Sequence, residues 1–150
     1  MPGDDEVTPS AAGEHRLRVR VYLEDTDAGG IVYHASYLRF LERVRTEWLR
    51  AMGLDQTRTF ADDLSFVVHS MSLRFLRPAR LDDVLLATCH VHAVRAASLI
   101  ASQRVVVEAT GEACCTAEVT VACISLATHR ARRLPAEVRG RLAREPVVAR

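Results

Sequence analysis

Three carboxylates, two adjacent glycines and one histidine lie close together in the stretch from Glu24 to His34. The pair Gly29–Gly30 interrupts an alternating apolar pattern and permits a sharp turn. A helical pattern starts at His34, and the first backbone N–H groups of a helix are unpaired and partially positive. A carbonyl placed there would be polarised as in an oxyanion hole, and Asp27 would supply a nucleophile or a base.

A purely structural role explains the same residues equally well. Acidic residues before a helix stabilise its start through the helix dipole and through turns closed by their side chains. If the preceding strand continued through them, Asp25 and Asp27 would share one face and Glu24 would lie on the other. His34 can likewise be an ordinary capping or packing residue. The residue types alone leave both interpretations open, and the structural one is the commoner.

The composition excludes several classes of function. The 150 residues suit a single domain, and 49% hydrophobic with 26% charged residues can form a core on a hydrated surface. Twenty basic and 19 acidic residues give a net charge of +1, which provides no broad cationic field for nucleic acid or an anionic membrane. No signal peptide or apolar run of about 20 residues is visible. We expect a cytoplasmic protein with neither nucleic acid nor a stably inserted membrane segment among its contacts.

The cysteines and histidines do not form a recognisable metal site. There is no C-x-x-C pair, and in the string "CHVH" no third ligand at a diagnostic spacing accompanies His90 and His92. We therefore expect no metal and no cofactor. The four cysteines are expected to be reduced, buried thiols: Cys89, Cys114, Cys115 and Cys123.

The stretch from Glu24 to His34 is here called the corner. The strand before it and the helix after it can be predicted from hydrophobic periodicity. Residues 1–15 have the composition of a disordered tail. Apolar and polar residues then alternate, which predicts a half-buried strand with its apolar face formed by Leu17, Val19, Val21 and Leu23. The string "HASYLRFLERVRTEWLRAMG" has apolar residues at helical spacing. It predicts a long helix that His34 or Ser36 caps and that ends before Gly53.

Four further strand-like runs and a basic tail complete the chain. The runs are "SFVVHSMSLRFL", "VLLATCHVHAV", "ASLIASQRVVV" and "ACCTAEVTVACIS", with short connections that favour antiparallel neighbours. In the first run, one face is predicted to carry Val67, His69, Met71, Leu73 and Phe75. Residues 16–128 would form the domain, and residues 129–150 a basic tail in which Pro135 permits a short helix.

This layout predicts an α+β fold of one long helix and a five-stranded antiparallel sheet. A single helix covers such a sheet only if the sheet curves around it. Some apolar surface would still remain exposed, which favours pairing with a second copy of the chain.

The string "RVYLEDTDAGGIVYHASYLRFLERVRTEWLRAMG" resembles the signature region of the 4-hydroxybenzoyl-CoA thioesterase-like hotdog family. Within that family it is most similar to the acyl-CoA thioesterases of the bacterial Tol–Pal gene neighbourhood. Its pattern D-x-D-x-x-G-I-V-Y-H-x-x-Y-L-x-F-x-E is long and specific. The later strings "FVVHSM", "PARLDD", "RAASL" and "EVTVACIS" also resemble family strands, so the resemblance covers about Arg18 to Ser125.

The resemblance implies a hotdog fold, a homodimer or homotetramer with active sites between subunits, and hydrolysis of acyl thioesters to acid and thiol. Asp27 falls on the family's catalytic aspartate, which acts as nucleophile or general base. His34 falls at the helix start, whose backbone N–H polarises the thioester carbonyl; its imidazole is a possible further participant. Gly30 and Tyr33 are implied substrate contacts in the same turn.

The resemblance also implies where the thiol carrier binds. Arg95 and Ser98 match the family's loop near the pantetheine and nucleotide. This chain has "RAAS" where some members have a basic run, so coenzyme A and acyl carrier protein both remain candidate carriers. Arg77 and Arg80, which flank Pro78, are candidate phosphate contacts.

Two other functions compete with hydrolysis. A hotdog hydratase would place a histidine and an acidic residue across a substrate tunnel, whereas an aspartate before the helix favours hydrolysis. The second is a non-catalytic acyl-binding or scaffold protein of the Tol–Pal envelope system. Asp27 at the expected position argues against lost catalysis but is compatible with an added scaffold role.

Overall fold

The computed structural model describes residues 7–9 and 13–142. Six strands form one antiparallel sheet in the order β1-β2-β4-β5-β6-β3. The strands are β1 (Val7–Pro9), β2 (His15–Arg20), β3 (Ser65–Phe75), β4 (Val84–Val94), β5 (Ser98–Val107) and β6 (Ala113–Ile124). The helices are the 3₁₀ turn η1 (Leu23–Asp25), α1 (His34–Ala51), α2 (Gln56–Ala61) and α3 (Ala136–Leu142).

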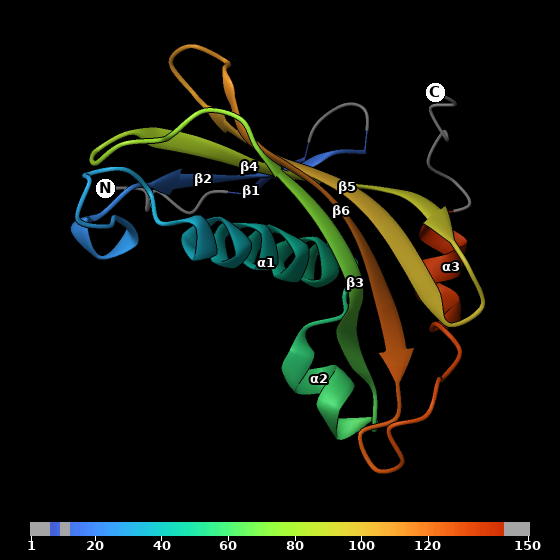
Figure 1. Cartoon of the computed structure of the whole chain (residues 1–150). Helices are drawn as coiled ribbons and strands as arrows, with labels where there is room; N and C mark the ends of the chain where they lie inside the picture. The colour runs from blue at the N-terminus through green and yellow to red at the C-terminus, as the bar shows by residue number, and fades with distance from the viewer. Residues whose placement is uncertain (1–6, 10–12, 143–150) are drawn as a thin grey trace.

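The sheet is strongly curved and α1 lies along its concave side (Figure 1), so the predicted α+β hotdog arrangement is confirmed. The sheet has one strand more than the five expected. The additional strand β1 lies within the predicted tail and pairs with β2, for example Val7 with Leu17. It is an edge strand, a position that tolerates Pro9. α3 lies on the side of the sheet away from α1 (Figure 1), contacts β4 and starts directly after Pro135.

The long helix α1 forms the centre of the core. Its buried side chains recur at helical spacing, because that spacing places them on the face turned toward the sheet; they include Tyr37, Phe40, Leu41, Val44 and Trp48. The helix begins at His34 as predicted, and Gly53 after its end has a φ of +79°. The predicted side-chain cap is wrong. Tyr33 is the N-cap and makes no side-chain capping bond.

The strand that leads into the corner is shorter than predicted. β2 ends at Arg20, and the backbone then turns through η1, so Leu23 is 74% exposed instead of buried. Asp25 is buried and Asp27 is exposed. The expectation that Asp25 and Asp27 share a face is therefore wrong, because a 3₁₀ turn replaces the strand alternation between them.

The edge strand β3 contains a bulge that changes which side chains face inward. The register against β6 shifts between Val68 and Ser70, so His69 is an extra residue. After it, Met71 and Leu73 pair with the buried Val119 and Ala117. A one-residue bulge reverses the alternation. Val67 and His69 therefore do not share the face of Met71 as predicted, and both are exposed.

The connection from β3 to β4 passes beside the candidate site. β3 pairs with β6, so β3 and β4 are not neighbours in the sheet despite their short connection. Along this connection, Val21 N–H donates to the Asp83 carbonyl at 2.9 Å, and Val32 N–H donates to the Ala79 carbonyl at 2.8 Å. These bonds hold the connection against the segment that carries the carboxylates.

The described chain shows neither a membrane-spanning helix nor a metal cluster. None of its helices is long and apolar enough to cross a membrane. Within the described residues, no three metal-binding side chains gather, and His92 Nε2 lies 3.9 Å from a carboxylate oxygen of Glu118. All four cysteines are free and buried. Burial raises the pKa of Cys89 to about 12, so this thiol is protonated at neutral pH.

Candidate active site

Asp27 occupies a tight turn directly before α1. Its Oδ1 accepts the backbone N–H of Gly29 at 2.8 Å, and its carbonyl accepts the N–H of Gly30 at 3.0 Å. Its own N–H donates to the carbonyl of Ile31 at 3.0 Å. Gly30 has a φ of +77°, which closes the turn at little steric cost because glycine has no Cβ. One carboxylate oxygen is thus fixed by the backbone on an exposed side chain.

Asp25 is buried in the same corner and accepts hydrogen bonds from three neighbouring residues. Its carboxylate Oδ2 accepts the N–H of Tyr22 at 2.9 Å. Its carbonyl accepts the N–H of Tyr33 at 2.9 Å and the hydroxyl of Ser36 at 3.2 Å. Ser36 is buried, so the residue expected as a cap instead fastens the helix start to the turn. Asp25 is a structural residue, in contrast to its exposed neighbour Asp27.

Tyr37 fixes the β3–β4 connection to α1. Its hydroxyl accepts the buried N–H of Ala79 at 3.1 Å. Burial raises the pKa of Tyr37, so the hydroxyl stays neutral. In the sequence, the spacing of Tyr37 places it only at the border of the apolar face of the helix and does not indicate a hydrogen bond to a segment far along the chain.

The N-terminal end of α1 presents free donors beside aromatic rings. Within the part of the chain that the structure describes, the N–H groups of His34 and Ala35 have no acceptor. The rings of Tyr33 and His34 lie 4.4 Å apart, and the His34 ring lies 6.2 Å from that of Phe75 on β3. Both Tyr33 and His34 are exposed. These N–H groups can therefore donate hydrogen bonds to the carbonyl oxygen of a bound ligand.

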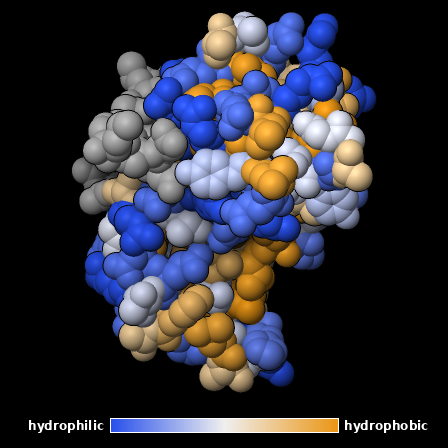
Figure 2. Space-filling model, turned by 90° about the vertical axis from the view of Figure 1, so that its left-hand side faces the viewer, coloured by the Kyte–Doolittle hydropathy of each residue, from blue (hydrophilic) through white to orange (hydrophobic). Residues whose placement is uncertain are grey.

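Large apolar side chains are exposed at this end of the molecule, where Figure 2 shows hydrophobic residues gathered on one face. They include Tyr22 (56% exposed), Leu23 (74%), Phe75 (51%) and Leu76 (53%). Arg80 is also near, because it forms a β-bridge with Ile31 beside the Asp27 turn. An exposed apolar patch next to a carboxylate and an arginine is typical of a surface that a ligand or another molecule covers.

The structure brings together only part of the predicted site. Asp27, Gly30, Tyr33 and His34 lie in one turn and the helix start that follows. Arg95 and Ser98 close the β4–β5 turn, where Arg95 N–H donates to the Ser98 carbonyl at 2.8 Å. β4 starts beside the site and is 11 residues long. At about 3.3 Å per residue, the curved strand separates these two residues from Asp27 by roughly 35 Å along its path. The prediction that they contact the same substrate requires a second subunit.

Comparisons with known proteins point to one family. The family model described as "Thioesterase-like superfamily" matches residues 21–142. "Acyl-CoA thioester hydrolase YbgC" of Escherichia coli O6:H1 is 44% identical over 123 residues, which cover 82% of this chain and 91% of that protein. "Acyl-CoA thioesterase YbgC" of Haemophilus influenzae is 41% identical over 122 residues, with coverages of 81% and 88%.

A solved structure shares the architecture. The probable thioesterase from Bartonella henselae superimposes with a TM-score of 0.76 at 36% identity, covering 81% of this chain and 99% of that one. The resemblance drawn from the sequence is thus confirmed. The family match over most of the chain, the identities and the shared fold show that this protein belongs to the thioesterase-like superfamily.

Proposed function

We propose that this protein hydrolyses acyl-CoA thioesters to a free acid and a thiol, with Asp27 as the catalytic carboxylate. One observation carries the proposal. The Asp27 carboxylate is fixed by the Gly29 N–H at 2.8 Å, beside a helix start whose first N–H groups lack acceptors among the described residues. The names of the relatives, which are acyl-CoA thioester hydrolases, support the same reaction.

In this mechanism the thioester carbonyl oxygen accepts the N–H of His34. The negative charge that develops on the oxygen is stabilised by that N–H and by the helix dipole. Asp27 either removes a proton from an attacking water or attacks the carbonyl carbon itself. In both versions the C–S bond breaks and the sulfur leaves as a thiolate, which takes up a proton. If Asp27 attacks, water then hydrolyses the acyl–Asp27 anhydride and regenerates the carboxylate.

The nearby residues complete the site in this proposal. A Cβ built on Gly30 would meet no atom within 4 Å, so the turn leaves open space for a ligand beside the backbone. Tyr33 and the His34 imidazole would form the wall next to the reacting carbonyl. Arg80, bridged to Ile31, is placed to contact a phosphate of the carrier. Arg77 is less free, because its Nη1 lies 3.9 Å from a carboxylate oxygen of Glu112.

We also propose that the active unit is a homodimer or a homotetramer built on the β3 edge. β3 ends the sheet, and it exposes Val67, Val68 and Phe75. A second copy would cover this edge and bring Arg95 and Ser98 of one subunit toward Asp27 of another. Light scattering at micromolar concentration should give two or four times the chain mass of 16.6 kDa. A stable monomer with full activity would contradict this arrangement.

An acyl-thioester panel with a free-thiol reagent tests the reaction itself. Hydrolysis predicts release of thiol from saturated acyl-CoA substrates in proportion to the acid formed. Loss of the double bond of an enoyl-CoA without thiol release would indicate a hydratase instead. If neither occurs while acyl-CoA still binds, the protein is a non-catalytic acyl-binding protein. The same acyl groups on acyl carrier protein show which carrier is preferred.

A single turnover in ¹⁸O-water separates the two roles of Asp27. Attack by Asp27 predicts that label enters its carboxylate when the anhydride is hydrolysed. Activation of water predicts that label appears only in the released acid. Mass spectrometry of the peptide that contains Asp27 gives the answer directly.

A further inference from the structure

A cavity of about 140 Å³ lies between α1 and the sheet, away from the Asp27 turn. Its sheet wall is formed by apolar side chains of β3 to β6, and its α1 wall includes Arg45, Trp48 and Leu49. Its volume is close to the ~150 Å³ of an apolar cavity that binds benzene. It therefore has room for about six carbon atoms.

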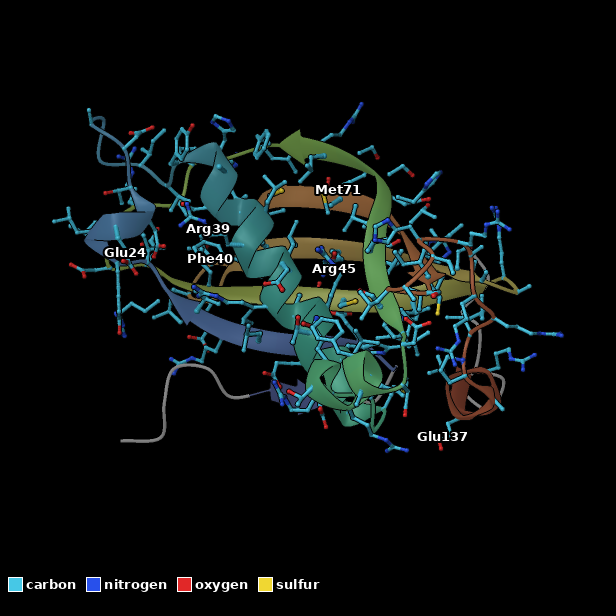
Figure 3. All side chains as sticks on the ribbon, turned by 90° about the horizontal axis from the view of Figure 1, so that it is seen from below. Glu24, Arg39, Phe40, Arg45, Met71 and Glu137 are labelled. Atoms are coloured by element: carbon cyan, nitrogen blue, oxygen red, sulfur yellow. The ribbon has the colours of Figure 1, made fainter. Side chains whose placement is uncertain are left out.

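Arg45 is held in this cavity by a fixed acceptor. Figure 3 shows α1 and β3 side by side, with Arg45 reaching from α1 into the space between them. Its Nη1 donates to Oε1 of Gln103 at 3.0 Å. Gln103 is 1% exposed, and its Nε2 donates to the carbonyl of Leu41 at 3.0 Å. The helix backbone thus sets the orientation of the Gln103 amide, which in turn positions the guanidinium.

Two of the residues that line the cavity, Arg45 and Trp48, keep N–H donors without acceptors among the described residues. No carboxylate of the described residues forms an ion pair with Arg45, and its hydrogen bond uses one of five N–H donors. Glu42 also lines the cavity, but its carboxylate accepts the hydroxyl of Thr46 at 3.2 Å. Trp48 is 2% exposed, and its Nε1 has no partner in the described chain. Burial lowers the pKa of Arg45, and the nearby Glu42 carboxylate opposes this shift.

The same face of α1 connects the cavity with the candidate active site. His34, Leu38, Glu42 and Arg45 follow each other at intervals of three or four residues and therefore form one stripe along the helix. His34 contacts Phe75 at one end of β3, and Phe66 and Val68 at the other end of β3 line the cavity with Arg45. At 1.5 Å per residue, Arg45 lies about 16 Å from His34 along the axis.

We propose that this cavity receives the far end of the acyl group and selects acyl groups that end in a hydrogen-bond acceptor. A carboxylate would gain most, because the guanidinium of Arg45 forms no ion pair within 4 Å among the described residues, although the charge of Glu42 at the same cavity acts on it; a hydroxyl would gain less. A methyl end would leave the remaining donors of Arg45 without acceptors. This inference rests on the proposed thioesterase function, since the acyl chain is positioned by its thioester at His34.

The first test compares three matched CoA thioesters on a dodecanoyl and on a hexadecanoyl chain, with methyl, hydroxyl or carboxylate ends. The wild-type kcat/KM should favour the carboxylate over the methyl end by about tenfold or more, with the hydroxyl between them. Arg45→Met keeps the buried stem but removes the donors, so this preference should disappear. Arg45→Lys should keep part of it, because it retains the charge without the planar fork.

Arg43→Met is the matched control on the same helix. Arg43 is exposed, with its guanidinium 5.9 Å from the Phe40 ring centre, and it does not line the cavity. This variant should keep the wild-type preference. Equal kcat/KM for the three ends, or a preference that survives Arg45→Met in a folded protein, would overturn the inference.

A binding measurement keeps the test independent of catalysis. Calorimetry with free dodecanedioate and free dodecanoate should show tighter binding of the dicarboxylate to wild type and no such difference in Arg45→Met. If no thioester is hydrolysed, the proposed function is wrong, and these affinities alone decide the inference. If thioesters are hydrolysed but the affinities are equal, only the inference fails.

Discussion

The carboxylate of Asp27 lies so close to the backbone of Gly29 that it leaves little room for a side chain there. Oδ1 of Asp27 accepts the Gly29 N–H at 2.8 Å, and a Cβ added to Gly29 would lie 3.2 Å from the same oxygen. Gly29 is not among the glycines with a positive φ, so the backbone itself would accept a side chain. A side chain at this position would instead press on the carboxylate, which would have to shift by a few tenths of an ångström.

Gly29→Ala should therefore lower activity more than stability. The added methyl pushes the Asp27 carboxylate by a few tenths of an ångström, which should reduce kcat/KM for acyl-CoA by about tenfold. The control is Gly111→Ala in the β5–β6 turn, where φ is +73° and no atom lies within 4 Å. That change should cost about 1 kcal/mol of unfolding free energy and leave kcat/KM unchanged. Wild-type kcat/KM in Gly29→Ala would contradict the positioning role.

Asp25 should matter for stability through its hydrogen bond to Tyr22. Asp25→Ala leaves the Tyr22 N–H without its acceptor and should lower the free energy of unfolding by about 1–2 kcal/mol. Asp25→Asn retains an oxygen acceptor and should cost clearly less. Urea denaturation of the two variants measures the difference, and equal losses would show that the hydrogen bond is not what stabilises the turn.

Tyr37→Phe should destabilise the protein without opening a cavity. The change removes only the hydroxyl that accepts the buried Ala79 N–H, at an expected cost of about 1–2 kcal/mol. Tyr33→Phe removes the hydroxyl of an exposed neighbour and should stay within about 0.5 kcal/mol of wild type. Thermal and urea unfolding of both variants provide the comparison. A larger loss of unfolding free energy in Tyr33→Phe than in Tyr37→Phe would contradict the stabilising role of the Tyr37 hydrogen bond.

Asp63 should make stability depend on pH at the acidic end. The Ser125 hydroxyl at 2.5 Å and the Ala127 N–H at 2.8 Å stabilise the ionised carboxylate and hold the pKa of Asp63 below its usual value. The contribution of Asp63 to the free energy of unfolding is therefore complete above about pH 3.9, its pKa in the unfolded chain. It is lost as the pH falls toward the lower pKa that Asp63 has in the folded protein. Asp63 has a φ of 56°, which asparagine also tolerates.

Asp63→Asn should thus be less stable than wild type at neutral pH, and the gap should close below about pH 4. Urea unfolding at a series of pH values measures the gap. A difference that stays constant down to about pH 3 would show that ionisation of Asp63 is not involved.

The long helix and the strands of the domain were predictable because their signals are local. The apolar spacing of α1 gave its start at His34, and alternation identified all strands from β2 to β6. The bulge at His69 was not predictable, since one extra residue leaves no mark in the apolar pattern. The η1 turn was missed for a similar reason, because Leu23 continues the alternation although it is exposed.

The candidate site could be found only through resemblance. In physical terms, an aspartate before a helix is ordinary, and the feature that distinguishes Asp27 from Asp25 is a fold-dependent difference in burial. Arg45 shows the same limit. Its position in the helical pattern does not show that Arg45, and not Arg43, lines a cavity. Its hydrogen-bond partner Gln103 lies 58 residues away on β5. Contacts of this kind exist only once the sheet has closed around the helix.

The most direct test of the proposed function is the rate of thiol release by Asp27→Asn compared with Asp25→Asn. Asparagine at position 27 keeps an oxygen that accepts the Gly29 N–H, so the turn survives while the basic and nucleophilic carboxylate is lost. We predict a fall in kcat of about 10²–10⁴-fold for Asp27→Asn with unchanged folding, and near wild-type kcat for Asp25→Asn. Near-full hydrolysis by Asp27→Asn would contradict the assignment of Asp27 as the catalytic carboxylate.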